Sequence, residues 1–265
     1  MKKTIYVFND GEFKRKDNTL LFETKEGKKY LPVEDISEII IFGDVVLNKR
    51  FLEFLTQREI ILHFLNHYGY YIGSYYPREH LNSGYMILKQ AEHYMDEEKR
   101  LILAKCFVRG AAANMLEVMR YYANRGKNIE RPLEAIAELM GRSEECQSVN
   151  ELMAIEGNIR DYYLQSFNPI IDKQGFEFIG RNRRPPQDRI NALISFGNTL
   201  AYTTVLSEIY KTHLDPRIGY LHTTNFRRFT LNLDVAEIFK PILADRVIFL
   251  LLARNMLRST HFESK

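Results

Sequence analysis

Three acidic residues and one histidine in the second half of the sequence are candidate ligands for a divalent metal ion: Glu156, His222, Asp234 and Glu237. A bound divalent ion acts as a Lewis acid and lowers the pKa of bound water or alcohol, which is the chemistry that a phosphodiester requires. Carboxylates with one imidazole suit manganese or magnesium better than a soft metal, although ligand type alone also allows zinc.

The spacing of these residues predicts the elements that would position them. Glu156 and Arg160 are four residues apart, so they lie on one face of a helix. A helix that opens near Leu233 would place Asp234 and Glu237 on one side, three residues apart, facing a preceding loop that contains His222. Two helices and one loop would then supply the ligands.

Each of these features also has a simpler interpretation. Glu156 and Arg160 could form a surface ion pair, which contributes only a few tenths of a kcal/mol. His222 could be a hydrogen-bonded structural histidine. Asp234 and Glu237 could be acids in the first turn of a helix, where the helix dipole favours them. The spacing alone is therefore a weak indication of a metal site.

A basic loop lies between the acidic segments, at residues 178–186, and leads into Asp188-Arg189-Ile190-Asn191-Ala192-Leu193. Arginines in such a loop can hold phosphates through fork-like hydrogen bonds that carry little sequence information. The same arginines could equally belong to a solvated loop. No glycine-rich phosphate loop is found in the sequence.

The first part of the chain predicts a small β-rich domain at residues 1–77. Short runs of strand-forming residues alternate with turn residues such as Asn9-Asp10-Gly11. One helix is expected over residues 48–57, with Asn48 as its N-cap. The expected strands are 4–8, 19–23, 28–31, 38–42, 60–65 and 70–75.

After a linker at residues 78–84, the sequence from 85 to 265 favours helices, with apolar residues at helical spacing. The expected breaks fall near residues 125–127, 141–143, 168–169, 184–186 and 213–216. The fold class is therefore α+β, a small N-terminal β-rich domain followed by a larger all-α catalytic domain.

Composition adds mild constraints. The chain has 265 residues, of which 45% are hydrophobic and 27% charged, so it can bury a sizeable core. A net charge of +3 is compatible with a polyanionic partner. Cys106 and Cys146 form neither a disulfide pattern nor a zinc motif. We find no signal peptide and no apolar run long enough for a membrane span, and we expect a cytoplasmic protein.

Four groups of residues in the second half of the chain form a specific pattern. They are Glu156-Gly157 with Arg160, the Arg183-Arg184-Pro185-Pro186 loop with Asn191-Ala192-Leu193, Leu214-Asp215-Pro216 with Gly219-Tyr220-Leu221-His222, and Leu233-Asp234 with Glu237 and Phe239-Lys240-Pro241. In their order and spacing these segments resemble the universal CRISPR-associated integrase, the endonuclease-like subunit of spacer acquisition. The match covers nearly the whole chain.

The resemblance implies that Glu156, His222 and Glu237 bind the catalytic Mn²⁺ or Mg²⁺. Asp234 corresponds to a second acid that lines the same pocket, and which of Asp234 and Glu237 is the closer ligand stays open. Candidates for holding DNA phosphates are Arg160, Arg181, Arg183, Arg184, Arg227 and Arg228.

The resemblance also implies a reaction and an assembly. The 3′-hydroxyl of a prespacer DNA would attack a phosphodiester at the leader-side end of a CRISPR repeat, a transesterification with associated endonuclease activity. The β-rich domain would form a homodimer, and a small ferredoxin-like CRISPR adaptation protein would bridge two dimers on double-stranded DNA, without a membrane.

Two departures from the family pattern are visible. Lys240 stands where arginine is common before the proline, which keeps the charge but loses the bidentate fork. Relatives usually continue through a further helix and a basic tail, so we expect the family's C-terminal tail to be missing after Lys265.

Two alternative functions are a catalytically silent DNA-binding or assembly module of the same fold and a helical metal hydrolase that acts on small phosphorylated molecules. The basic loop argues against the second.

Overall fold

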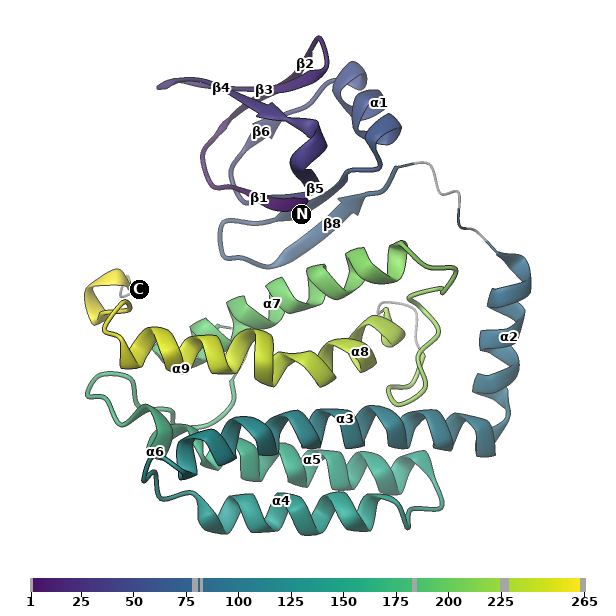
Figure 1. Cartoon of the computed structure of the whole chain (residues 1–265), viewed down its shortest axis with the longest axis vertical. Coiled ribbons are helices and arrows are strands. Elements are labelled where there is room, and N and C mark those ends of the chain that lie inside the picture. The colour runs from purple at the N-terminus through teal and green to yellow at the C-terminus, as the bar shows by residue number, and fades with distance from the viewer. Residues whose placement is uncertain (1, 78–80, 82, 183–184, 225–228, 263–265) are drawn as a thin grey trace. The chain divides into compact units, whose positions relative to one another are not determined.

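The computed structural model describes residues 2–77, 81, 83–182, 185–224 and 229–262. The chain divides into two compact units, Met1–Asn82 and Ser83–Lys265. The first is built mainly of strands and the second of helices, which confirms the predicted α+β class (Figure 1). No helix in the described ranges is long and apolar enough to cross a bilayer.

The first unit contains two four-stranded sheets. One has the order β1-β5-β7-β8, in which β8 alone runs antiparallel to its neighbour. The other has the order β4-β3-β2-β6, in which β6 runs parallel to β2. The strands are β1 (Lys3–Val7), β2 (Gly11–Lys16), β3 (Thr19–Thr24), β4 (Gly27–Pro32), β5 (Ile36–Ile41), β6 (Val45–Val46), β7 (Ile61–Leu65) and β8 (Tyr71–Tyr75).

The core of this unit contains the alternate residues of its strands, such as Ile39 and Ile41 of β5, together with α1 (Lys49–Arg58). The side chain of Asn48 accepts a hydrogen bond from the backbone N–H of Phe51 at 3.0 Å, which confirms the predicted N-cap. The helix ends at Glu59, which adopts a left-handed conformation with φ of 57°.

The sequence pattern missed two of these strands, β2 and β6. β2 is strongly charged, and only its residue Phe13 is fully buried. One of these charges is paired across the ladder, since Lys14 Nζ lies 2.7 Å from a carboxylate oxygen of Glu23 on β3. Cross-strand pairing therefore stabilises a segment whose own residues do not form a recognisable strand pattern.

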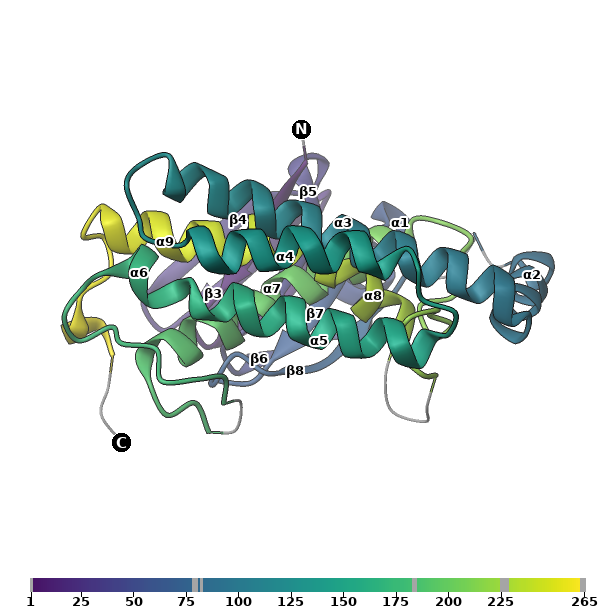
Figure 2. The same ribbon diagram turned by 90° about the horizontal axis from the view of Figure 1, so that it is seen from below.

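The second unit is organised around the long helix α3, which packs against α4 and α5 on one side and α8 on the other (Figures 1 and 2). The helices are α2 (Gly84–Met95), α3 (Glu97–Ala123), α4 (Glu130–Ser143), α5 (Val149–Gln165), α6 (Phe167–Ile171), α7 (Arg189–Tyr210), α8 (Thr230–Lys240) and α9 (Arg246–Ala253).

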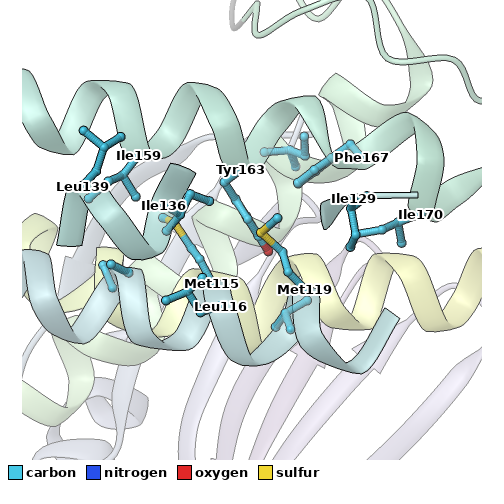
Figure 3. Packing of buried hydrophobic residues seen from close by; sticks show 14 of the residues in the cluster. Met115, Leu116, Met119, Ile129, Ile136, Leu139, Ile159, Tyr163, Phe167 and Ile170 are labelled. Carbon is cyan, nitrogen blue, oxygen red and sulfur yellow. The ribbon is translucent and has the colours of Figure 1, made fainter. Parts of the chain in front are cut away.

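Figure 3 shows how the apolar faces of these helices meet. Met115 and Met119 lie four residues apart on α3 and are buried against Ile136 of α4 and against Ile159 and Tyr163 of α5. Residues four apart share one helical face, so this spacing produces a continuous apolar stripe. The packing fixes the position of α5, which carries Glu156.

Helix α8 begins at Thr230, three residues before the predicted start near Leu233. It continues through a π-helical turn, η2 (Pro241–Asp245), directly into α9. Asp234 and Glu237 therefore lie beyond the first turn of α8, and that turn contains no acidic residue. The interpretation that they are first-turn acids favoured by the helix dipole is wrong.

Candidate metal centre

Asp234 is fully buried on α8 and accepts hydrogen bonds from three consecutive backbone N–H groups of the preceding loop. Its Oδ2 accepts from Tyr220 at 2.6 Å and from Leu221 at 2.9 Å, and its Oδ1 accepts from the backbone N–H of His222 at 3.1 Å. One carboxylate thus fixes the loop that carries the histidine.

The imidazole of His222 is bound by the same carboxylate. Its Nδ1 lies 2.7 Å from Oδ1 of Asp234, and an ionised carboxylate only accepts, so Nδ1 is the protonated nitrogen. The other ring nitrogen, Nε2, then carries the lone pair that a metal needs. Both oxygens of Asp234 are already engaged, so its geometry suits orienting His222 better than binding a metal.

The loop lies so close to α8 that Gly219 has no room for a side chain. A Cβ atom there would come within 2.5 Å of the backbone of Thr230 and 2.7 Å of Oδ2 of Asp234. The backbone N–H of Gly219 donates to Oγ1 of Thr230 at 2.9 Å. Glycine at this position therefore allows the close approach on which the Asp234 contacts depend.

Sequence reasoning missed two residues that hold this loop from outside. Gln90 of α2 is buried, and its side chain both accepts from the backbone N–H of Asp215 at 2.7 Å and donates to the carbonyl of Asp215 at 3.1 Å. Arg100 of α3 donates from Nε to the carbonyl of Tyr220 at 2.9 Å. Neither residue carries a local signal, because each contact joins segments more than 100 residues apart.

Glu156 of α5 and Glu237 of α8 are brought together by one guanidinium. Nη1 of Arg160 lies 3.7 Å from Oε1 of Glu156, and Nη2 of Arg160 lies 3.4 Å from Oε2 of Glu237. The remaining oxygen of Glu237, Oε1, is paired with Nζ of Lys240. The Glu156 side chain is only 14% exposed, so the interpretation of a surface ion pair is wrong.

The two carboxylates have different electrostatic environments. Burial alone would raise the pKa of Glu237, but Lys240 and Arg160 outweigh it and hold this pKa at about 2. Burial raises the pKa of Glu156, and Arg160 only partly opposes this effect. A protonated His222 would lower the pKa of both Glu156 and Glu237. The three side chains are therefore close enough for their charges to interact.

The donor set fits a hard divalent cation. Two carboxylates already converge on one cationic group, and the nearby imidazole is held in the tautomer that leaves Nε2 for a metal. Among the described residues, however, no three acidic, histidine or cysteine side chains are close enough together to form a ready-made metal cluster. Arg160 and Lys240 occupy the oxygens of Glu156 and Glu237 instead.

The arginines predicted to hold phosphates fall into three groups. Arg160 lies within the carboxylate pair. Arg181 lies before α7, where its guanidinium donates to Oδ1 of Asn191 at 2.7 Å and to Oγ of Ser195 at 3.1 Å, so it joins the basic loop to that helix. The others, Arg183, Arg184, Arg227 and Arg228, lie outside the described residues.

Asp245, in the π-helical turn, is a buried acid close to this centre. It lines a cavity of about 30 Å³ together with Arg160, Glu237 and Lys240. Burial raises the pKa of Asp245 to about 7, although Arg160 favours its ionised form. In the unfolded chain this carboxyl ionises near its ordinary pKa of 3.8. Between these two pH values, only the unfolded state loses the proton.

The free energy of unfolding should therefore fall as the pH rises from about 4 to about 7. The decrease caused by Asp245 over this range should be roughly 4 kcal/mol. Asp245→Asn should remove this contribution, so the variant gains stability relative to the parent chain as the pH rises. Urea unfolding at a series of pH values measures the difference. Asp161→Asn, on the exposed face of α5, is the control, and a pH-independent difference for Asp245→Asn would contradict the prediction.

Comparison with known proteins agrees with this architecture. A family model described as CRISPR associated protein Cas1 matches residues 5–265. The CRISPR-associated endonuclease Cas1 2 of Thermodesulfovibrio yellowstonii is 64% identical over 265 residues, which are all of this chain and 80% of that protein. These similarities define an enzyme of the nuclease and integrase class.

Solved structures of related proteins have the same fold. A Cas1 protein from Thermotoga maritima superimposes with a TM-score of 0.89 at 49% identity, covering 99% of this chain and 82% of that one. A casposase bound to its integration product shares the fold, with a TM-score of 0.86 at 21% identity, covering 100% of this chain and 76% of that one. The chain belongs to the Cas1 family of CRISPR-associated proteins.

Proposed function

We propose that this chain is the integrase of CRISPR adaptation, which joins the 3′-hydroxyls of prespacer DNA to a CRISPR repeat in a metal-dependent transesterification and also cleaves DNA. The observation that carries the proposal is the convergence of Glu156 and Glu237 on one cationic group, beside a histidine oriented by Asp234. Membership of the Cas1 family supports the choice of DNA as substrate.

In this proposal, Glu156, Glu237 and Nε2 of His222 would hold Mn²⁺ or Mg²⁺, and the bound ion would supply Lewis-acid polarisation of the scissile phosphate and of the attacking hydroxyl. Asp234 keeps the proton on Nδ1 of His222 and thereby holds the imidazole in its binding tautomer. Arg160, which has a planar fork of donors, can hold a phosphate oxygen pair. The residues therefore supply positioning and charge stabilisation, on which phosphoryl transfer mainly depends.

The reaction needs no covalent enzyme intermediate. The prespacer 3′-oxygen forms a new bond to phosphorus as it loses its proton. The bond from that phosphorus to the 3′-oxygen of the adjoining leader nucleotide breaks, and the released 3′-oxygen takes up a proton to become a hydroxyl. The number of phosphodiester bonds is unchanged. When water replaces the 3′-hydroxyl as the attacking group, the same site performs endonuclease hydrolysis.

The proposed assembly is a homodimer formed through the β-rich unit at residues 1–77, linked by residues 78–84 to the catalytic unit at residues 85–265. A small ferredoxin-like adaptation protein would bridge two such dimers. A solved structure described as a Cas6-RT-Cas1–Cas2 complex contains a chain of the same fold, which supports another CRISPR-associated protein as a partner.

Metal removal tests the proposal directly. The chain, with and without its small partner, is incubated with a prespacer duplex and a supercoiled plasmid that bears a leader and repeat, and half-site joining is measured. Joining should require Mn²⁺ or Mg²⁺ and should stop on addition of EDTA, while DNA binding persists and weakens steeply with salt. Salt-dependent binding without joining at any divalent concentration would favour the catalytically silent module instead.

A further inference from the structure

The carboxylates of the proposed metal site are already neutralised by two side chains of the protein. Lys240 is paired with Oε1 of Glu237, and Arg160 lies 3.4 Å from Oε2 of Glu237 and 3.7 Å from Glu156. All four side chains are at most 25% exposed. A divalent ion that binds Glu237 must therefore compete with both cations, and at Glu156 it must compete with Arg160.

We propose that Lys240 and Arg160 are exchangeable counter-ions, which leave Glu156 and Glu237 for DNA phosphates when a divalent metal binds, so that metal and DNA bind cooperatively. The inference rests on the proposed function, because it assumes that these carboxylates hold the metal. It adds a regulation of that site: in the absence of DNA, the site should hold metal weakly.

A count of charges supports the coupling. Two carboxylates and two basic side chains make a neutral group, and the neighbouring Asp234 carboxylate, bound to neutral His222, adds one negative charge. A divalent ion added to these side chains without compensation leaves an unbalanced positive charge in a largely buried place, which is costly. DNA phosphates are negatively charged, so their binding would restore neutrality.

The geometry supports the exchange as well. Lys240 follows Glu237 by three residues on α8, and Arg160 follows Glu156 by four residues on α5, so each cation stays within one helical turn of its carboxylate. A rotation about side-chain bonds is enough to release either cation. Arg160 offers a bidentate fork and Lys240 a compact point charge, and both are groups that bind phosphate.

The experiment measures Mn²⁺ affinity by titration calorimetry, with and without a short DNA duplex and with duplex-only blanks. Wild-type chain should bind Mn²⁺ at least about fivefold more tightly with DNA, the lower range of typical allosteric couplings. The same factor should appear when DNA affinity is measured with and without Mn²⁺. Lys240→Met should tighten Mn²⁺ binding in the absence of DNA and reduce the coupling.

Lys211→Met is the matched control, because Lys211 makes a lysine–glutamate pair with the same three-residue separation, to Glu208 at 2.6 Å on the surface. It removes the same charge and should leave the Mn²⁺ affinity without DNA unchanged. Lys240→Gln serves as a second variant with a polar end, and thermal unfolding without metal verifies that both Lys240 variants fold.

Equal Mn²⁺ affinity with and without DNA would overturn the inference, as would a Lys240 variant that folds but does not bind Mn²⁺ more tightly. Glu237→Gln separates this failure from failure of the proposed function. If Glu237→Gln abolishes Mn²⁺ binding while coupling is absent, only the exchange mechanism is wrong. If Glu237→Gln leaves Mn²⁺ binding unchanged, the proposed metal site itself is wrong.

Discussion

Glu156→Gln should reduce metal-dependent strand joining by more than about a hundredfold while leaving duplex binding, measured without divalent metal, nearly intact. Outer-shell partners of metal ligands contribute roughly 10- to 100-fold to affinity or activity, and a direct ligand should contribute more. Glutamine keeps the volume and an amide oxygen that can still face the Arg160 guanidinium, so the 14% exposed site need not collapse. The lower rate of joining would then result from the missing negative charge of the carboxylate, which attracts the metal.

Half-site joining under single-turnover conditions measures the rate, and a filter-binding titration measures the affinity for DNA. Asp161→Asn is the matched control, because Asp161 is an exposed acid on the same helix, α5, and should retain full activity. Metal-stimulated joining by Glu156→Gln at the wild-type rate would count decisively against the proposed site. Joint loss of joining and DNA binding would indicate misfolding instead.

Asp234→Asn should lower strand joining by about 10- to 100-fold and should also destabilise the fold by roughly 3 kcal/mol. The buried carboxylate accepts from three backbone N–H groups and from His222 Nδ1. An asparagine offers one acceptor oxygen and turns an NH₂ group toward donors, so some of these N–H groups lose their partners. The His222 loop should then be poorly fixed and the imidazole tautomer no longer specified.

If Asp234 positions His222, the Mn²⁺ affinity of the folded Asp234→Asn variant should fall together with its activity. Asp215→Asn provides the comparison. Asp215 is a buried acid in the same segment that also accepts a backbone N–H, from Arg217 at 2.9 Å, but it does not contact His222. That variant should lose some stability and keep its activity per folded molecule. Wild-type Mn²⁺ affinity in Asp234→Asn would refute the positioning role.

Local patterns were enough to predict the order of the elements. The alternation of apolar residues predicted β1, β3, β4, β5, β7 and β8, and the helical spacing after residue 85 predicted the second unit. The Asn48 cap was also predictable, because a cap depends on residues within one turn. The strand β2 was not, because its residues are strongly charged and one stabilising partner, Glu23 for Lys14, lies on a neighbouring strand.

The candidate site shows the same division. The sequence and its resemblance to a family supplied the four candidate residues Glu156, His222, Asp234 and Glu237, but left the roles of Asp234 and Glu237 open. The tertiary structure distinguishes them by their neighbours, since Asp234 is engaged by the backbone of the His222 loop and Glu237 by Arg160 and Lys240.

The sequence by itself thus determined the fold class and the Asn48 cap, because periodicity and capping depend on residues within a few positions of one another, and its resemblance to a family supplied the candidate ligands. Only the tertiary structure decided which acid orients the histidine, which cations neutralise the carboxylates, and that Gln90 and Arg100 hold the loop. These contacts arise where helices distant in sequence pack together, and hydrogen bonds and charges then follow from which surfaces meet rather than from local spacing.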